Sequence, residues 1–254
     1  MKGNLTIDIG NTWVKVAYYL DTQLVATTRF ASGDGQVLGR FISTYKPDTA
    51  ILCSTASPAV TQDILGQAQS RCRRVLQLTH ETPMPIRLAY RTPETLGRDR
   101  IATAVGAWSI VSDEGEPGDV LVIDAGTAIT YDLTLADGSF VGGNIAPGVG
   151  LRFAALHEHT GRLPLVSPQG DMPQVGYDTE TAIRSGVLLG VLGEVRSYIA
   201  ALGDEHPGLR IFLAGGDGKW IHDHLEGIRA DYYEQLAAEG LNRILLYNQA
   251  NGNC

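Results

Sequence analysis

The sequence repeats one short pattern at a fixed distance, and this repeat constrains the fold more than any other feature. An apolar run near the N-terminus ends at Asp8 and Gly10, and a second apolar run ends at Asp124 and Gly126. The two segments superpose at a constant offset of 116 residues (124 − 8 and 126 − 10). A repeat of this kind predicts an architecture built from two related units.

Each copy of the pattern continues into another β-rich run, 13–19 in the first copy and 128–133 in the second. A strand, a glycine turn and a second strand predict a hairpin with an acidic corner. Between the copies lies a polar, Gly- and Pro-containing segment, 113–119, which is typical of a loop. We therefore expect two α/β halves, residues 1–115 and 116–254.

Helical periodicity accounts for much of the remaining chain. Apolar residues recur at steps of three and four in 98–112 and again in 180–202, which predicts two amphipathic helices. A short apolar strand is expected at 209–214, and Gly215 and Gly216 break it before a further helix. The chain therefore offers a third glycine corner at the end of a strand.

Composition excludes several functional classes. Twenty Lys and Arg residues against twenty-eight Asp and Glu residues give a net charge of -8, and no basic run occurs, so a nucleic-acid or anionic-membrane surface is not expected. No apolar run approaches the roughly 18 residues of a membrane span. The N-terminus lacks the apolar region of a signal peptide, and three widely spaced cysteines form no metal motif. We expect a cytoplasmic protein.

The first corner has the residue types that a phosphate site needs. Gly10 lets the backbone approach a ligand closely, and Asn11 and Thr12 are side-chain donors for phosphate oxygens. Asp8 would repel a phosphate unless Mg²⁺ stood between them, and Lys15 could reach a terminal phosphate. One such corner is more often an ordinary hairpin turn, but two copies and a third Gly-Gly corner favour phosphate binding.

A second group of polar residues opens the helix predicted at 98–112. Asp99 stands between Arg98 and Arg100 at the helix N-terminus, where the helix dipole also favours a negative charge. A charged carboxylate there could accept a proton from an attacking hydroxyl, and Arg100 could hold a substrate carboxylate. The alternative is a surface ion pair that caps the helix, which is the commoner role of such a triplet.

The paired Asp-Gly corners and the later Gly-Gly turn resemble the actin, hexokinase and acetate-kinase superfamily. The resemblance implies two similar ribonuclease H-like domains, duplicated, with mixed sheets flanked by helices. It also implies that ATP lies between phosphate loops and that Gly215 and Gly216 meet the adenosine. The P-loop pattern of other nucleotide-binding proteins is absent from the sequence.

Further motifs narrow the resemblance to one family. The segment 141–149 reads VGGNIAPGV, and 155–164 reads ALHEHTGRLP. Together with Gly97–Arg100 and the two corners, they resemble the type III pantothenate kinases over nearly the whole chain. The resemblance implies ATP-dependent phosphorylation of pantothenate to 4′-phosphopantothenate, the first step of coenzyme A biosynthesis, by a homodimer.

The resemblance also assigns a role to individual positions. It implies that Asp99 is the general base, that Asp124 holds a monovalent cation, either K⁺ or NH4⁺, and that Asp8 reaches Mg²⁺ through phosphate or water. The residues it implies for ATP are Asp8, Gly10, Asn11, Thr12, Lys15, Gly126, Thr127, Gly215 and Gly216. Those it implies for pantothenate are Tyr90, Gly97, Arg98, Asp99, Arg100 and Thr179.

One departure and two alternatives remain at this stage. Arg98 stands where the family often has a small residue, and its guanidinium could bind the substrate carboxylate or point to solvent. The chain could also be another kinase or an exopolyphosphatase of the superfamily. A catalytically inactive, kinase-like regulator is a further alternative, although the residues of both corners and Asp99 are all present.

Overall fold

The computed structural model describes residues 3–32, 34–115 and 118–253, which form two compact units. Unit 1 consists of Met1–Pro117, Thr134–Val141 and Gln235–Cys254, and unit 2 consists of Gly118–Leu133 and Gly142–Glu234. The halves predicted from the repeat, 1–115 and 116–254, divide the chain differently and stay a prediction about its duplication. Their boundary falls beside residues 116–117, which lie outside the described residues.

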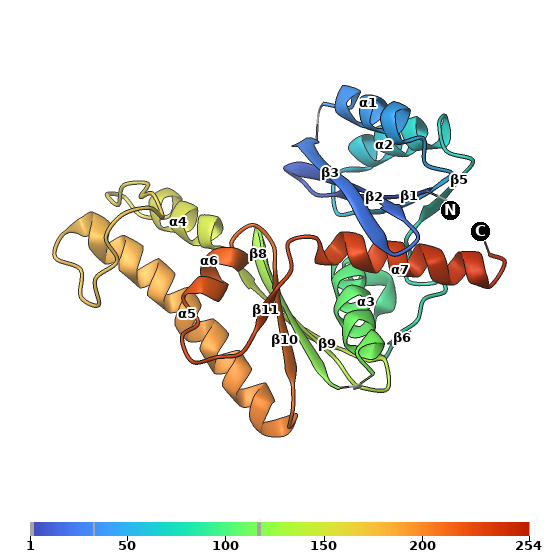
Figure 1. The fold of residues 1–254 in the computed structure, drawn as a ribbon. Helices are drawn as coiled ribbons and strands as arrows, with labels where there is room; N and C mark the ends of the chain where they lie inside the picture. The colour runs from blue at the N-terminus through green and yellow to red at the C-terminus, as the bar shows by residue number, and fades with distance from the viewer. Residues whose placement is uncertain (1–2, 33, 116–117, 254) are drawn as a thin grey trace. The chain divides into compact units, whose positions relative to one another are not determined.

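Unit 1 is built on a five-stranded mixed sheet (Figure 1). Its strand order is β3-β2-β1-β4-β5, with β1 antiparallel to β2 and parallel to β4. The strands are β1 (Gly3–Ile9), β2 (Trp13–Leu20), β3 (Gln23–Ala31), β4 (Thr49–Ser54) and β5 (Arg74–Gln77). The predicted hairpin at the first corner is confirmed, because β1 and β2 pair directly across it.

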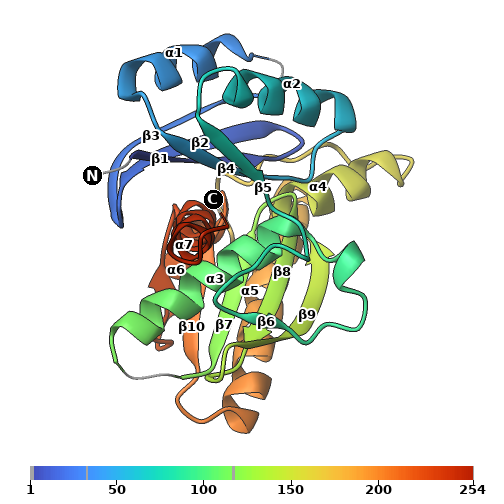
Figure 2. The ribbon, with the colours of Figure 1, turned by 90° about the vertical axis from the view of Figure 1, so that its right-hand side faces the viewer.

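Helices cover both faces of this sheet (Figure 2). One face carries α1 (Gln36–Tyr45) and α2 (Pro58–Gln69), and α7 (Leu236–Ala250) packs on the other, against β1 and β4. Helix α3 (Arg98–Asp113), predicted over 98–112, packs along α7. The helix begins after a short 3-10 turn, η1 (Pro93–Thr95), so that turn places the Arg98–Arg100 triplet at its N-terminus.

The second sheet has the strand order β11-β10-β7-β8-β9-β6. Its strands are β7 (Val120–Ala125), β8 (Ala128–Thr134), β9 (Ser139–Pro147), β10 (Arg210–Ala214), β11 (Asp231–Tyr232) and β6 (Arg87–Leu88). The succession β9-β8-β7-β10-β11 repeats the order β3-β2-β1-β4-β5 of the first sheet. The two corners therefore occupy equivalent places, each following the central strand of its own sheet.

Unit 2 also contains α4 (Val149–Glu158), α5 (Thr179–Glu205) and α6 (Gly218–Asp223). Helix α5, predicted over 180–202, runs beside the strands of this unit (Figure 1). By length and composition it is apolar enough to cross a membrane, with a mean hydropathy of 1.3 over its most apolar window. Its apolar residues include Val187, Val191 and Val195, which are buried in the core of unit 2. Packing in that core accounts for the apolar composition of this helix.

Candidate active site

The first corner lies at the end of β1, where strand pairing places its two charged residues opposite each other. Asp8 pairs with Lys15 across the hairpin, and the Gly10 N–H donates to the Trp13 carbonyl over 3.0 Å to close the turn. Asn11, Thr12 and Lys15 are exposed, so their polar groups can reach a ligand. The structure thus brings together all the residues predicted at this corner.

Asp8 is the electrostatic centre of this corner. Burial raises the pKa of its carboxyl group, the Lys15 ammonium lowers it, and the negative charge of Asp99 raises it again. The Cys53 thiol on neighbouring β4 donates to Asp8 Oδ1 over 3.4 Å and lowers the pKa slightly. Asp99 is therefore close enough to Asp8 to act on its charge, although 91 positions separate the two residues in the chain (99 − 8).

Asp99 occupies the first turn of α3, as the sequence predicts. Its Oδ1 accepts a hydrogen bond from the Arg100 backbone N–H over 2.9 Å, which holds the carboxylate against the helix N-terminus. The Thr103 hydroxyl donates to the Asp99 carbonyl over 3.2 Å. The first contact holds one carboxylate oxygen, and the second holds the backbone of the same residue.

The two neighbouring arginines have different surroundings. Arg98 folds back onto its own loop and donates to the carbonyls of Pro93, Glu94 and Leu96, so most of its donors are already in use. Arg100 is buried, and its guanidinium lies 5.9 Å from the ring centre of Tyr90, which was predicted to share its pocket. Structural contacts account for Arg98, whereas Arg100 and Tyr90 remain together in one aromatic and cationic cluster.

The second corner is shaped by close backbone contacts. The Gly148 N–H donates to the Thr127 carbonyl over 3.0 Å, and the Asp217 N–H donates to the Ala125 carbonyl over 2.9 Å. Gly215 has a φ of +85°, and a Cβ there would lie 2.5 Å from Asp124 Oδ1 and overlap the Ala125 carbonyl oxygen. Only glycine permits this close approach. The third glycine corner thus packs directly on the second.

A cavity of about 730 Å³ opens beside this corner, within unit 2. Gly126 and Thr127 form one part of its lining, and Asp217, next to the predicted Gly215 and Gly216, forms another. Apolar side chains such as Phe153 complete it. Its volume lies within the range of about 300–1,000 Å³ that is typical of small-molecule sites. A groove of about 870 Å³ between α1 and α2 in unit 1 is larger, but none of the predicted site residues lines it.

Known proteins resemble the chain in sequence over almost all of its length. The sequence profile of the type III pantothenate kinases matches residues 4–201. A type III pantothenate kinase from Bacteroides fragilis is 43% identical over 246 residues, which cover 96% of this chain and 98% of that protein. The chain belongs to the type III pantothenate kinase family.

Solved structures agree with this family in fold. A conserved protein of Campylobacter jejuni, described as a candidate Baf family transcriptional activator, aligns with a TM-score of 0.60 at 21% identity, over 98% of this chain and 100% of that one. A glucokinase from an Antarctic psychrotroph aligns with a TM-score of 0.54 at 13% identity, over 98% and 99%. The predicted α/β fold of the actin and hexokinase class is confirmed.

Thr179, predicted to meet pantothenate, is the first residue of α5 in this family member. Asp178 caps the helix by accepting the Thr181 N–H over 2.8 Å, and the Thr181 hydroxyl accepts the Asp178 N–H in return. The reciprocal pair fixes the start of the helix, and Thr179 is exposed beside it. Its role in substrate binding stays a prediction.

Sequence reasoning missed two features of the cavity. Asp217 lines it, and burial raises the pKa of its carboxyl group. The wall formed by Leu165–Pro168 comes from the connection between α4 and α5, which has no helix or strand of its own. The position of Asp217 after the Gly-Gly pair was a usable signal, whereas the wall segment has no periodicity that points to a site.

The described residues also bear on metal binding. Among residues 3–32, 34–115 and 118–253, no group of three or more His, Cys, Asp or Glu side chains gathers to hold a metal ion. Mg²⁺ in phosphoryl-transfer enzymes commonly binds through one or two carboxylates together with substrate phosphates, so a complete protein cage is not required. The single carboxylate of Asp8, among exposed phosphate donors, fits that mode of binding.

Proposed function

We propose that this chain transfers the γ-phosphoryl group of ATP to the 4′-hydroxyl of pantothenate and so forms 4′-phosphopantothenate for coenzyme A biosynthesis. Family membership supports the substrate pair. The observation that carries the chemistry is the electrostatic interaction of Asp99 with Asp8, the strand partner of Lys15, within unit 1, which joins a carboxylate that can accept a proton to a phosphate-binding corner. An ordinary hairpin turn would not need Asp99 nearby.

The chemistry assigned to these residues is an in-line displacement. The pantothenate hydroxyl oxygen attacks the γ-phosphorus, the bond from that phosphorus to the β,γ-bridging oxygen breaks, and ADP leaves. The hydroxyl proton passes to the free carboxylate oxygen of Asp99. Because phosphoryl transfer depends mainly on alignment and charge neutralisation, Lys15 contributes by holding the terminal phosphate with its positive charge.

The corner amides and Asp8 complete the phosphate site. The Asn11 and Thr12 side chains and the backbone around Gly10 donate to phosphate oxygens and orient the triphosphate. Mg²⁺, when bound through Asp8, supplies further positive charge to the phosphates. Arg100 and Tyr90 are assigned to pantothenate, with the guanidinium binding its carboxylate. Gly97 and Thr179 are assigned to the same substrate, and Arg98 is assigned to it through the loop that its guanidinium holds.

A monovalent cation, K⁺ or NH4⁺, is assigned to Asp124. The fit rests on oxygen donors: Asp124 Oδ1 and the Ala125 carbonyl oxygen both approach the same side of Gly215. Clustered oxygens suit a hard cation. We further propose that Gly126, Thr127, Gly215 and Gly216 contact ATP, and that the enzyme acts as a homodimer in the cytoplasm. Exposed apolar residues in unit 2, such as Ile145, are consistent with an interface.

One assay tests the proposed function. Purified protein is incubated with Mg-ATP and each of pantothenate, acetate and a hexose, and ADP release and phosphorylated product are measured with K⁺, NH4⁺ or Na⁺ as the added cation. We expect phosphopantothenate only, and faster turnover with K⁺ or NH4⁺ than with Na⁺. Turnover of another acceptor would favour a different kinase of the superfamily, and ATP-independent release of phosphate from polyphosphate would favour an exopolyphosphatase. No turnover with any acceptor would favour a regulator.

A further inference from the structure

One wall of the cavity in unit 2 is formed by irregular chain and not by a helix or strand. Leu165, Val166, Ser167 and Pro168 form it, within the connection between α4 and α5. A long irregular connection is normally the most mobile part of a unit, because few hydrogen bonds fix its backbone. Val166 is buried in the core of unit 2 and anchors one point of the wall. A second anchor is needed to fix the carbonyls that follow it.

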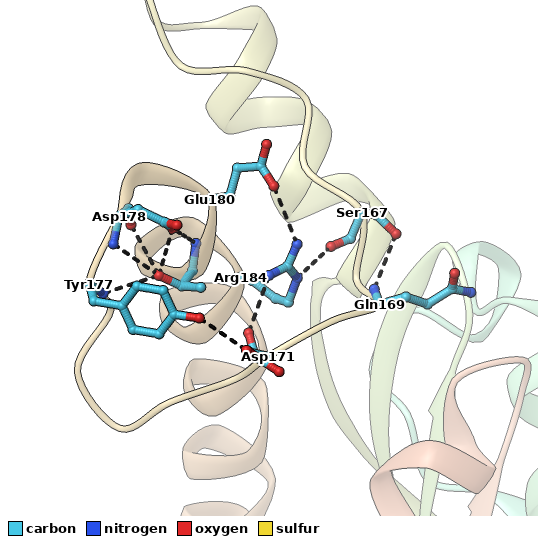
Figure 3. Close-up of polar contacts among 8 residues, drawn as sticks. Ser167, Gln169, Asp171, Tyr177, Asp178, Glu180 and Arg184 are labelled. Atoms are coloured by element: carbon cyan, nitrogen blue, oxygen red, sulfur yellow. Dashed lines mark hydrogen bonds and ion pairs between the residues drawn. The ribbon is translucent and has the colours of Figure 1, made fainter.

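Arg184 supplies this anchor from the second turn of α5 (Figure 3). Its side chain is only 8% exposed, and it points from the helix to the loop. The Nε donates to the Ser167 carbonyl over 2.9 Å, and Nη1 donates to the Asp171 carbonyl over 3.2 Å. We call these two hydrogen bonds the Arg184 clamp. One guanidinium thus ties both ends of residues 167–171 to a rigid helix.

The backbone between these carbonyls is shaped to fit the guanidinium. Gly170 has a φ of +123°, and a Cβ at this position would lie 3.0 Å from Arg184 Cζ. The loop therefore passes directly over the face of the arginine. On the far side, the Tyr177 hydroxyl donates to Asp171 Oδ2 over 3.0 Å, and Glu180 pairs with Arg184 Nη2 at 3.8 Å. These outer contacts support the clamp but are exposed to solvent.

Besides its ion pair with exposed Glu180, the Arg184 guanidinium gives its Nε and Nη1 donors to neutral backbone carbonyls. A buried guanidinium is costly unless its donors are used, and here they are used on a segment that lines a cavity. The clamp therefore fixes the backbone at Ser167, which lines the cavity.

Resting on the proposed function, we infer that Arg184 is a positioning residue for ATP: its clamp preorganises the segment Ser167–Asp171, of which Ser167 and Pro168 line the same cavity as Gly126, Thr127 and Asp217. Arg184 does not itself line the cavity, so it acts through the loop. Without the clamp, the loop must be ordered when the nucleotide binds, and the entropy of that ordering weakens affinity. Loss of the clamp should not change the phosphoryl-transfer step itself, because the residues assigned to that step belong to unit 1.

The test compares Arg184→Ala with Arg196→Ala, a matched control on the same helix. Arg196 also donates to a backbone carbonyl, that of His224 over 2.8 Å, but it does not line or support the cavity. Binding of the non-hydrolysable analogue Mg-AMPPNP is measured by calorimetry without pantothenate. We expect the Kd to rise about tenfold in Arg184→Ala, the cost of ordering the backbone of about one residue on binding, and to stay unchanged in Arg196→Ala.

Kinetics and hydrogen exchange separate positioning from general stability. In Arg184→Ala the KM for ATP should rise with little change in kcat, and amide exchange in 163–178 should accelerate. Arg184→Lys, which retains one donor, should recover part of the affinity and also serves if Arg184→Ala does not fold. Added guanidinium at low millimolar concentration should partly restore binding to Arg184→Ala.

Three outcomes would overturn the inference: an unchanged AMPPNP Kd in a folded Arg184→Ala protein, an equal loss of affinity in Arg196→Ala, or a fall in kcat with unchanged KM. Failure of the proposed function looks different. If the wild-type protein binds AMPPNP but phosphorylates no pantothenate, the assignment of pantothenate as acceptor is wrong. The AMPPNP affinities of the variants then still test whether Arg184 positions the loop. If the wild type binds no AMPPNP, both are wrong.

Discussion

The two Asp-Gly corners occupy equivalent places in their sheets but are built in different ways. At the first, Asp8 is surrounded by side chains that carry or share charge: Lys15, Cys53 and Asp99. At the second, Gly148 and Gly215 bring backbone segments into close contact. The same local sequence pattern thus gives a corner with charged side chains around its aspartate in one unit and a corner with closely packed backbones in the other.

This difference suggests a division of labour between the corners. Charged side chains that shift the pKa of a carboxylate suit the reacting phosphate and the proton that must be moved. Converging backbones and an apolar cavity suit recognition of the rest of a nucleotide. Variants of the first corner should therefore lower kcat, and variants of the second should weaken nucleotide binding.

The largest effect is expected from Asp99→Asn. The amide keeps the shape of the carboxylate and can still accept the Arg100 N–H, but it cannot take a proton, so kcat with ATP and pantothenate should fall by about 10²–10⁴. The Kd for Mg-AMPPNP should remain at the wild-type value, because Asp99 is not among the residues assigned to ATP. Steady-state kinetics and calorimetry on the same preparation provide the two measurements.

Asp113→Asn is the matched control for this variant. Asp113 ends the same helix, where it pairs with Arg243 at 2.7 Å, far along α3 from Asp99. It should leave kcat unchanged, since an exposed ion pair contributes little. A wild-type kcat in Asp99→Asn would show that Asp99 is not the general base. The first corner would then have no demonstrated role in catalysis to set against nucleotide binding at the second.

A smaller but more general effect is expected from Gly215→Ala at the second corner. The added Cβ must overlap the Ala125 carbonyl and adopt a left-handed φ, so the corner has to shift and unit 2 loses stability. We expect a lower Tm, by about 2–4 °C for each kcal/mol lost, and a higher Kd for Mg-AMPPNP. Thermal unfolding and calorimetry measure the two effects.

Gly227→Ala separates backbone strain from the close approach. Gly227 also has a positive φ, +75°, but no atom lies within 4 Å of the position its Cβ would take. It should lower the Tm through strain alone and leave the Kd at the wild-type value. Equal losses of nucleotide affinity in the two variants would mean that the packing at Gly215 does not shape the second corner.

The sequence predicts the parts of this molecule that depend on local pattern. The repeat located both hairpins, and helical periodicity located α3 and α5 to within a few residues. It also placed Asp99 at a helix start, while its role as the general base came from the family resemblance and stays a prediction. The repeat predicted two related halves, and the structure adds that their sheets share a strand order.

The remaining features of the site come from contacts between distant segments. The Cys53 thiol meets Asp8 because β4 pairs with β1, and this parallel register is not encoded by the turn that defines the corner. Arg184 reaches Ser167, 17 positions earlier in the chain, from the helix that follows the irregular connection. A guanidinium in an otherwise apolar helix reads as a solvent-facing residue, so only the folded loop reveals that its donors face inward.

The smallest effect is the most specific test of the first corner: Asp8→Asn should raise the Tm while it lowers activity. Burial raises the pKa of Asp8, so the folded state holds this proton more tightly than the unfolded chain does. The stability linked to the protonated form is present below the unfolded pKa and is lost as the pH rises through the folded pKa. At neutral pH the wild type therefore carries the cost of a buried charge that Asn avoids.

The pH profile of the Tm difference decides whether this reasoning holds. Between Asp8→Asn and wild type, the difference should be small near pH 3.8, the ordinary pKa of an aspartate, and should grow towards neutral pH. Asp137→Asn should behave oppositely, because hydrogen bonds from Ser139 lower the pKa of Asp137 and its carboxylate stabilises the protein above the unfolded pKa. That variant should lower the Tm at neutral pH and approach wild type in acid. A flat profile for Asp8→Asn would mean that the attraction of Lys15 offsets the cost of burying the charge of Asp8. In that case the buried charge would not destabilise the free protein, and binding of phosphates and Mg²⁺ would gain nothing from stabilising it.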